Sequence, residues 1–344
     1  MSCITGRTSW VSAIACGCET RGFLMASSNP DGADILVRLT EISYGAAGIN
    51  IYRFSSIDGA RLPEFEPGAH IDLQISSPHR RQYSLLWPAP SANSYSVAVQ
   101  LDSAGRGGSR AFHHESVVGN TYRISAPRNN FRVHPGAERY ALFAGGIGIT
   151  PIASMYRNLK ERGAAVALHY WTANPLRTLF YDELSGDADV HLMHDVSLGA
   201  PAVQIADVIR ALPPDTQLYC CGPERMLNEF DAVCTGRPAG VAHRERFGST
   251  VKNTSGDEFQ VMLKRSNRAL TVAPSESVLQ ACLKAGIDVA YSCEEGVCGA
   301  CEVAVLEGKV DHRDSILTPE QRQQHKKMMI CCSRARDTSL VLDL

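Results

Sequence analysis

The spacing of the cysteines near the C-terminal end constrains this chain more than any other feature. The sequence reads S-C-E-E-G-V-C-G-A-C there, which places Cys293, Cys298 and Cys301 in a C-x4-C-x2-C pattern. A fourth cysteine follows after 29 residues if it is Cys331, or after 30 if it is Cys332. Four thiolates in this arrangement are typical of plant-type 2Fe-2S clusters. The spacing therefore predicts a fold built around such a cluster.

Two alternatives to the cluster are weaker. Zinc ribbons usually pair two short cysteine knuckles, and only Cys298 and Cys301 form one. Buried core thiols would not be expected at this spacing with Gly296 and Gly299 between them, where the backbone must turn sharply. The chain has 12 cysteines in 344 residues, and in a long chain clustered cysteines more often bind metal or do redox chemistry than form disulfides.

Length and composition limit the number of domains and the classes of protein to which the chain can belong. The length suits two or three domains, and 44% hydrophobic residues are enough for globular cores. The formal net charge of −2 gives no basic footprint for nucleic acid. No run of about 18 apolar residues is present, so a membrane-spanning helix is not expected. Residues 1–30 are rich in Ser, Thr, Cys and Gly and are expected to be a disordered leader.

Short alternating apolar runs fill the region from Ile35 to about Val133, with turns rich in Gly, Pro and Ser between them. This pattern predicts a small antiparallel β-barrel. The runs that carry the prediction are 35–39, 69–73, 94–101 and 121–125.

Two motifs in the predicted barrel suit a bound flavin phosphate. Arg81, Tyr83 and Ser84 are expected at the start of a strand. Arg81 can form two hydrogen bonds to a phosphate, Tyr83 has a flat ring that can stack on a flavin, and Ser84 has a hydroxyl for the ring edge or the ribityl chain. Gly105-Arg106-Gly107-Gly108-Ser109 precedes an expected helix at 110–115, whose N-terminus favours an anion. Taken singly, the first motif could be an arginine at the surface and a tyrosine in the core of a barrel without a ligand. The second could be a glycine turn without a ligand.

From Tyr140 to about Phe247 strands alternate with helices, which predicts parallel α/β units. Strands are expected at 140–144, 165–171, 189–193 and 217–221. The first helix is expected after the strand at 140–144 and runs through residue 162. Further helices are expected near 179–184, near 205–212 and from Pro223 onward.

Two glycine-containing segments follow strands of this region. The first contains Gly145, Gly146 and Gly148, with Thr150 as a candidate cap and Pro151 in the first helical turn. Because ligands of open α/β sheets bind outside the carboxyl ends of strands, this segment is expected to approach a pyrophosphate.

The second segment is Cys221-Gly222-Pro223, between a strand and a helix. It is expected at the same edge of the sheet as the first segment. Cys221 could line a nicotinamide pocket or could be a buried core thiol.

A polar stretch at 249–257 is expected to be a linker. A hairpin is predicted at 258–264 and 270–272, and a final strand at 339–344. Between them, 275–285 has the pattern of an amphipathic helix with Ser275 as its N-cap. Its predicted buried face consists of Val278, Leu279, Cys282 and Leu283.

With these motifs assembled, the chain from about Asp34 to Leu344 resembles the phthalate dioxygenase reductase family. These are the flavin- and ferredoxin-containing reductases of Rieske oxygenases, vanillate demethylase reductases among them. The resemblance is carried by R-Q-Y-S at 81–84, G-R-G-G-S at 105–109, P-R-N-N-F at 127–131, A-G-G-I-G-I-T-P at 144–151, C-G-P at 221–223, E-R-F-G at 245–248, the cysteine segment at 292–301 and C-C-S-R-A at 331–335.

The resemblance implies three cofactor domains. They are an FMN-binding antiparallel β-barrel, an NAD-binding α/β domain with a parallel sheet, and a plant-type ferredoxin domain of α+β, β-grasp type. Their expected ranges are 31–137, 138–248 and 258–344.

The family's functional residues carry over motif by motif. Arg81, Tyr83 and Ser84 would contact FMN, and 106–109 its phosphate. Phe247 stands where an aromatic ring covers the flavin, with Glu245 and Cys221 beside flavin and nicotinamide. Cys331 matches the fourth cluster ligand, after Cys293, Cys298 and Cys301, so Cys332 is expected to be a bystander.

The implied enzyme is a cytoplasmic, NADH-dependent oxidoreductase that reduces a terminal Rieske-type oxygenase. Hydride carries two electrons and the cluster accepts one, so a flavin must lie between them. This chemistry requires no general base. The sequence lacks an acidic residue for the ribose 2′-hydroxyl after the strand at 165–171, and Arg177 leaves NADPH as an alternative. A cytochrome, a ferredoxin or a ferric chelate as acceptor, and a non-enzymatic redox sensor, are the competing hypotheses.

Overall fold

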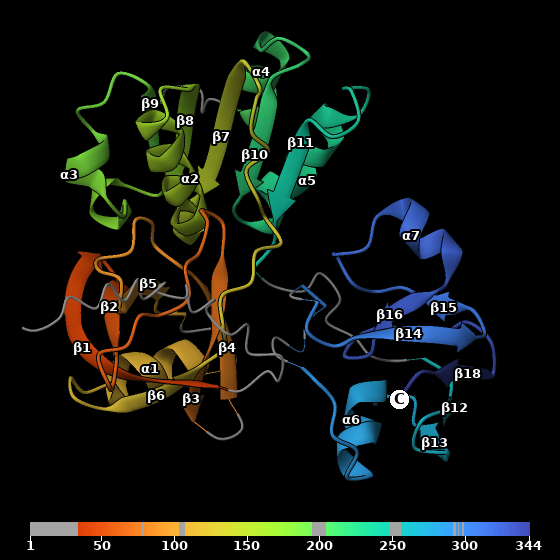
Figure 1. Ribbon diagram of the computed structural model, residues 1–344. Coiled ribbons are helices and arrows are strands. Elements are labelled where there is room, and N and C mark those ends of the chain that lie inside the picture. Colours follow the sequence, from red (N-terminus) through yellow and green to blue (C-terminus); the bar gives the residue numbers. More distant parts are fainter. Residues whose placement is uncertain are drawn as a thin grey trace, which may run out of the picture. The chain divides into compact units, whose positions relative to one another are not determined.

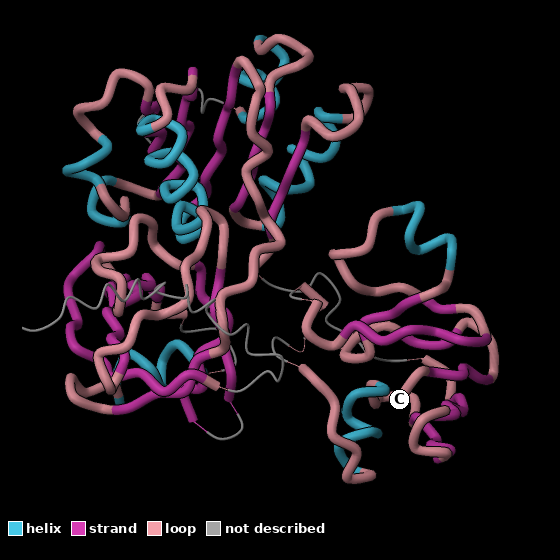
Figure 2. Tube along the Cα trace, viewed as in Figure 1, coloured by secondary structure: helices cyan, strands magenta, loops and turns pink. Residues whose placement is uncertain are grey.

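The computed structural model describes residues 34–76, 79–102, 107–194, 204–247, 256–291, 294, 296–297 and 299–344. All of these belong to one compact unit, Asp34–Leu344. The expected leader and residues 249–255 of the expected linker lie outside the described residues. The described chain forms an antiparallel, a parallel and a mixed sheet (Figures 1 and 2). The predicted fold class is therefore confirmed.

The first sheet is antiparallel, and the part of it that is described has the strand order β4-β3-β6-β1-β2-β5. The strands are β1 (Ile35–Ala46), β2 (Ile49–Ser56), β3 (His70–Ser76), β4 (His79–Ser84), β5 (Ser94–Gln100) and β6 (Thr121–Ile124). A bridge between Leu85 and Val97 joins the end of β4 to β5. The amide of Leu86 also donates to the carbonyl of Ser96 at 2.9 Å. These contacts close the sheet into a barrel.

Two details of the barrel differ from the sequence-based expectation. Arg81 lies within β4, and Tyr83 and Ser84 lie at its end, not at the start of a strand. Helix α1 (Gly108–Glu115) begins two residues earlier than expected, with Gly107 as its N-cap in a left-handed conformation (φ 89°) that glycine readily adopts.

The second sheet is parallel, with the order β11-β10-β7-β8-β9 in the described chain. Its strands are β7 (Arg139–Gly145), β8 (Ala165–Thr172), β9 (Val190–His194), β10 (Gln217–Cys221) and β11 (Ala242–Glu245). Its helices are η1 (Gly146–Gly148), α2 (Ile149–Glu161), η2 (Pro175–Arg177), α3 (Tyr181–Leu184), α4 (Ile205–Ala211) and α5 (Glu224–Cys234). Within this sheet, the edge strand β11 is the one that sequence patterning missed.

Helices cover both faces of this parallel sheet. Successive residues of β10 point to opposite faces, so Cys221 joins the core beneath α2 and Cys220 the core beneath α4 and α5. This is the arrangement expected where parallel strands are connected through helices.

The core beneath α2 continues into the barrel. It contains Ala46, Ile49 and Ala98 from the barrel strands and Leu86 just beyond β4. The fully buried hydroxyl of Ser154 in α2 reinforces this junction, because it donates to the Leu85 carbonyl at 3.1 Å and accepts from the Trp87 amide at 3.0 Å. The end of β4 is therefore fixed against the parallel sheet.

The third sheet is mixed, and its described order is β13-β12-β18-β14-β16. The strands are β12 (Phe259–Leu263), β13 (Arg268–Val272), β14 (Glu302–Glu307), β16 (Lys327–Met329) and β18 (Ser339–Leu342), with a separate pair β15 (Val310–Asp311) and β17 (Arg334–Ala335). Helices α6 (Val278–Lys284) and α7 (Pro319–Gln324) belong to the same region. No helix in the described residues is long and apolar enough to cross a membrane.

Helix α6 corrects two expectations. Its N-cap is Ser277, not Ser275, and Ser277 forms a capping box with Gln280. The Ser277 hydroxyl accepts from the Gln280 amide at 3.1 Å, and the Gln280 side chain accepts from the Ser277 amide at 3.0 Å. Leu283 is 40% exposed, whereas Val278, Leu279 and Cys282 are buried as predicted. Leu283 therefore does not belong to the buried face of α6.

Replacing Ser277 with Ala removes half of the capping box, so Ser277→Ala should lower the free energy of unfolding by about 1 kcal/mol. The measurement is urea denaturation of the full chain followed by circular dichroism. Ser277→Asp is the matched control, because its carboxylate still accepts from the Gln280 amide and stability should be retained. Equal losses in the two variants would contradict this role for the cap.

Candidate functional site

Buried polar atoms without partners gather where the barrel meets the parallel sheet. Ser84 Oγ and Gln82 Nε2 at the end of β4, and both ring nitrogens of His70 in β3, have no hydrogen-bond partner among the described side chains and backbone. His70 and Ser84 are directly opposite in the β3–β4 ladder, so their side chains share one face. Buried polar groups in proteins are normally hydrogen-bonded. Their clustering here indicates a site shaped for a ligand.

Glu245 reaches this same place from β11. Its Oε1 lies 3.9 Å from His70 Nδ1, and its Oε2 is buried without a partner among the described atoms. Burial raises the pKa of Glu245 to about 8 and, together with the nearby Arg128 guanidinium, lowers the pKa of His70 to about 4. Both groups are therefore mainly neutral at pH 7.

The predicted phosphate cradle lies at the N-terminus of α1. A Cβ at Gly108 would lie 2.7 Å from Arg81 Nε, so any larger residue there would force the Arg81 side chain to move. The Arg81 side chain thus lies directly over the first turn of α1, where amides and guanidinium together suit an anion. The Ser109 hydroxyl accepts from the Asp102 amide at 3.1 Å. Arg106 lies outside the described residues.

Two aromatic side chains were expected near the flavin ring. Tyr83 packs on Phe112 of α1, with ring centroids 6.3 Å apart and an interplanar angle of 25°. Burial raises the pKa of the Tyr83 hydroxyl. Phe247 is 46% exposed, although large apolar rings are usually covered. Its exposure agrees with a ring that covers a cofactor and can be displaced, which stays a prediction.

The two glycine segments of the parallel sheet lie against each other. A Cβ on Gly148 would be 2.3 Å from the Cys221 carbonyl oxygen, and one on Gly145 would be 2.5 Å from Cδ of Pro223 and 3.3 Å from Gly222 Cα. These glycines are therefore required for packing between the segments. Gly146 differs, because it has φ 53° and nothing within 4 Å of its Cβ position. Of the three, Gly146 is the one with open space at its backbone, and its contact with a pyrophosphate stays a prediction.

Other residues of these segments are more internal than expected. Thr150 is not the helix cap, because α2 is capped by Gly148 without a side-chain bond and Thr150 Oγ1 donates to the Ile147 carbonyl at 3.0 Å. Cys221 is only 1% exposed, and burial raises the pKa of its thiol. This environment agrees with the core-thiol alternative, and contact with nicotinamide stays a prediction.

The expected cluster ligands are described in part. Cys293 and Cys298 lie outside the described residues, whereas Cys301 and Cys331 are both buried. Hydrogen bonding with Cys301 and with Cys332, together with burial, raises the pKa of the Cys331 thiol. Converging buried thiols of this kind gain a compensating positive charge when they bind metal. Cys301 and Cys331 therefore fit two of the four thiolate ligands that a 2Fe-2S cluster requires.

Cys332, which is expected to be a bystander, has its own contacts. Its Sγ donates to the Met329 carbonyl at 3.8 Å. A Cβ on Gly296 would come within 2.5 Å of this sulfur, so Cys332 lies under the turn of the cluster loop. Gly296 and Gly299 both have positive φ, at 69° and 77°, which confirms the sharp turning predicted for them.

The residues at the end of β4 and the start of α1 fit the FMN that the sequence implies, because they leave unpartnered buried polar atoms beside an anion cradle.

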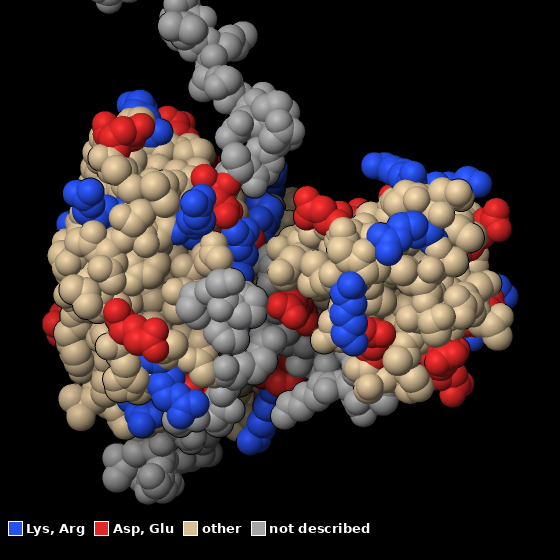
Figure 3. Space-filling model, turned by 90° about the horizontal axis from the view of Figure 1, so that it is seen from below, with Lys and Arg blue, Asp and Glu red and all other residues tan. Residues whose placement is uncertain are grey.

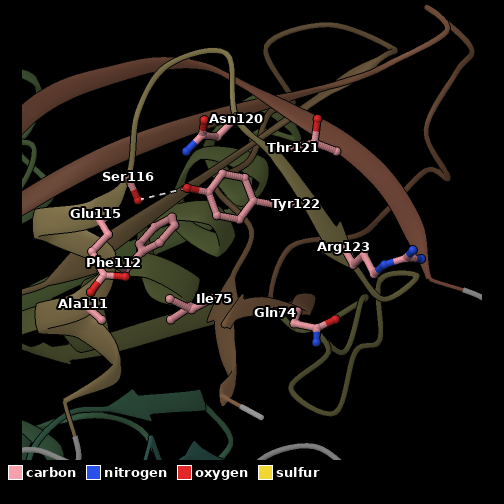
Figure 4. Close-up of a pocket in the computed structure, with 10 residues that line it drawn as sticks. All are labelled: Gln74, Ile75, Ala111, Phe112, Glu115, Ser116, Asn120, Thr121, Tyr122 and Arg123. Atoms are coloured by element: carbon pink, nitrogen blue, oxygen red, sulfur yellow. Dashed lines mark hydrogen bonds between the residues drawn. The ribbon is translucent and has the colours of Figure 1, made fainter. Parts of the chain in front are cut away.

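A separate groove of about 540 Å³ lies on the barrel among β3, α1 and β6 (Figure 4). None of the predicted cofactor residues lines it. Tyr122 and Ser116 are hydrogen-bonded across its wall at 3.4 Å. The face seen in Figure 3 carries basic and acidic side chains interspersed, without a continuous basic surface.

His70 is the site residue that sequence reasoning missed. The sequence offered only an isolated histidine in an apolar strand, and nothing local linked it to Glu245. The closest available signal was its position in a strand next to the R-Q-Y-S motif, since neighbouring strands of a barrel can share a face.

Comparisons with known proteins identify relatives of this chain. The family profile described as "2Fe-2S iron-sulfur cluster binding domain" matches residues 261–336. The chain is 36% identical to phenoxybenzoate dioxygenase subunit beta of Ectopseudomonas oleovorans, over 91% of this chain and 98% of that protein. It is also 36% identical to phthalate dioxygenase reductase of Burkholderia cepacia, over 93% of this chain and all of that protein.

A solved structure supports the same similarity. It is described as phthalate dioxygenase reductase, a modular structure for electron transfer from pyridine nucleotides to [2Fe-2S]. The match has a TM-score of 0.70 at 34% identity and covers 91% of this chain and 98% of that chain.

Substituting Gly148 should damage packing, and substituting Gly146 should damage coenzyme binding. Gly148→Ala forces a methyl group into the Cys221 carbonyl and is expected to cost about 3 kcal/mol of folding free energy. Gly146→Ala has open space and is expected to cost about 1 kcal/mol through its left-handed conformation, while weakening NADH binding. Thermal unfolding and NADH titration measure the two effects. A Gly148→Ala protein as stable as wild type would contradict the packing argument.

The choice of the fourth cluster ligand is tested by exchanging each adjacent cysteine. Cys331→Ser is expected to abolish the cluster, seen as loss of bound iron, of acid-labile sulfide and of visible absorbance. Cys332→Ser should retain all three, because the Cys332 thiol is hydrogen-bonded to the Met329 carbonyl, a bond that a serine hydroxyl can replace. The reverse pattern would assign the ligand to Cys332.

Proposed function

Because the chain belongs to the phthalate dioxygenase reductase family, we propose that it passes electrons from NADH through FMN and a 2Fe-2S cluster to a terminal Rieske-type oxygenase. The observation that carries the proposal is the match of 93% of this chain to the full length of phthalate dioxygenase reductase. A match of that extent spans the barrel, the parallel sheet and the cluster region together.

The proposed division of labour follows the described site. Arg81, Ser84 and the 107–109 segment hold the flavin and its phosphate, with Tyr83 and Phe247 against the ring. FMN supplies the exchange between a two-electron hydride and single electrons, which the cluster accepts one at a time. The protein contributes position, burial and electrostatics rather than a general base.

The coenzyme is proposed to lie along the carboxyl edge of the parallel sheet. Gly145, Gly146, Gly148 and Thr150 form the first contact segment, and Cys221-Gly222-Pro223 forms the second. NADH is the proposed substrate. The segment after β8 has no acidic residue to bind a ribose 2′-hydroxyl, and Arg177 is exposed at the end of η2. The coenzyme assay therefore includes NADPH.

The cluster is proposed to be held by Cys293, Cys298, Cys301 and Cys331. The electron acceptor is a partner oxygenase, as it is for proteins named as reductase subunits of oxygenase systems. The proposed location is the cytoplasm, where reduced nicotinamide coenzyme is available and thiols stay reduced.

The purified protein should show both flavin and 2Fe-2S absorbance, and anaerobic NADH should bleach both. NADPH should bleach them more slowly. A preparation that binds both groups but is not reduced by NADH would contradict the proposal.

The acceptor is distinguished by adding candidates to the reduced protein. Turnover coupled to a Rieske oxygenase, well above turnover with cytochrome c, a ferredoxin or a ferric chelate, is the expected result. A preference for one of the latter would reassign the acceptor, and no NADH-dependent reduction of any acceptor would favour a redox sensor.

A further inference from the structure

The chain just after β11 is held by an arginine with two carboxylate partners. Arg246 directly follows β11, and its Nη1 is ion-paired with Glu224 while its Nη2 lies 3.2 Å from Asp231 Oδ2. Both carboxylates belong to α5, which lies beside β11 (Figure 1). Because these two acids are seven residues apart in the helix, they lie on the same face of it. The guanidinium therefore connects the end of β11 to two points on one face of α5.

Burial distinguishes these ion pairs from an ordinary surface pair. The Arg246 side chain is only 9% exposed, whereas Arg210 and Asp207 of α4 form a pair in which both side chains are 68% exposed. Exposed pairs contribute little, because water and salt screen them and long side chains lose freedom. A largely buried, planar guanidinium that bridges two carboxylates fixes the backbone that carries it more firmly. Asp231 is also paired with Arg244 of β11 at 2.6 Å, which holds the same edge of the sheet to α5.

The anchor lies where the ladder of the sheet ends. The last ladder pair of β10 and β11 joins Cys221 to Glu245, so Arg246 and Phe247 lie beyond it. Successive side chains point in opposite directions here, Glu245 toward His70 of the barrel and Arg246 toward α5. Phe247 is the next residue, and its ring is half-exposed. The ion pairs of Arg246 therefore fix the backbone from which this ring projects.

The same helix also continues one of the two proposed coenzyme segments. Helix α5 has Pro223 as its N-cap and begins at Glu224, so the segment 221–223 runs directly into the anchor. The proposed cover of the flavin and the proposed coenzyme contact are thus joined through one arginine. Moving the backbone at Phe247 away from 221–223 requires these ion pairs to break.

We propose that Arg246 is a positioning residue that holds Phe247 over the flavin face that nicotinamide must reach. The proposal rests on the proposed function, because it concerns the ring that the coenzyme displaces there. With its backbone fixed through Glu224 and Asp231, the ring leaves by rotation of its side chain and returns to the same place when the coenzyme departs. Arg246 therefore sets how strongly Phe247 competes with nicotinamide.

This competition has a measurable size. Where a cover occupies a binding face, the apparent dissociation constant is the intrinsic one divided by the fraction of molecules that are open. A ring in place for about four-fifths of the time would weaken NAD⁺ binding about fivefold. Loosening the backbone of the ring lowers the covered fraction, so loss of the anchor should tighten NAD⁺ binding. Loss of an ordinary structural contact would not tighten it.

The test is a titration of the oxidised holoprotein with NAD⁺, followed by the change in flavin absorbance. Arg246→Met keeps the apolar stem of the side chain but removes both ion pairs, and it should bind NAD⁺ about threefold more tightly than the wild type. Arg246→Lys has a single ammonium in place of the fork, and its affinity should lie between the two. Phe247→Ala removes the ring and should give the full increase of about fivefold.

Glu229→Gln is the matched control on the same helix. The Glu229 carboxylate accepts from the Ala206 amide at 3.2 Å, so its hydrogen bond connects α5 to α4 rather than to β11. This variant should bind NAD⁺ with wild-type affinity. The double variant of Arg246→Met and Phe247→Ala should bind NAD⁺ no more tightly than Phe247→Ala alone, because the anchor acts through that ring.

Amide hydrogen exchange of the holoprotein gives a second measurement that does not depend on the flavin spectrum. In Arg246→Met the amides of 244–247 should exchange faster, whereas those of β10 should keep their wild-type rate. If Arg246→Met does not fold, the variant that combines Glu224→Gln with Asp231→Asn removes both carboxylates and leaves the arginine in place. It should show the same tighter NAD⁺ binding and the same faster exchange.

Three results would overturn the positioning role: unchanged or weaker NAD⁺ binding after loss of the ion pairs, a tightening that adds to that of Phe247→Ala, or wild-type exchange at 244–247. Reduction of flavin and cluster by NADH is measured separately in the wild type. Normal reduction with any of these three results would reject the role of Arg246 alone, whereas absent reduction would reject the proposed function.

Discussion

One hydrophobic core runs from the barrel into the parallel sheet, and the chemistry of the site depends on it. Barrel residues such as Ile49 and Leu86 share this core with Leu142 and Tyr170 of the parallel sheet. The Ser154 hydroxyl ties the chain just beyond β4 to α2 at two backbone atoms. Breaking either contact would leave a buried donor or acceptor unpaired, which costs more than the bond contributes. The end of β4 is therefore held beside the carboxyl ends of β10 and β11.

This constraint explains why the site is assembled from distant segments. Ser84 ends β4, His70 begins β3, and Glu245 ends β11. Each lies at the end of a strand, where the ladder fixes the backbone but one side remains open to a ligand. Their unpartnered atoms would be costly in an empty core and are expected where a bound group supplies the missing hydrogen bonds. Close packing explains Gly145 and Gly148, because the loop that contains them meets the loop at 221–223 and leaves no room for a side chain.

Sequence patterning predicted the features that are local. The cysteine spacing, the β10 range and the two helix-starting glycine loops were all visible within short windows. It failed where two local solutions compete, as at α6, where Ser275 and Ser277 both precede the helix and only Ser277 can form a capping box with Gln280. It also missed β11, whose four residues A-H-R-E show no apolar alternation. The contact between His70 and Glu245 depends on how two domains meet, and no local pattern records that.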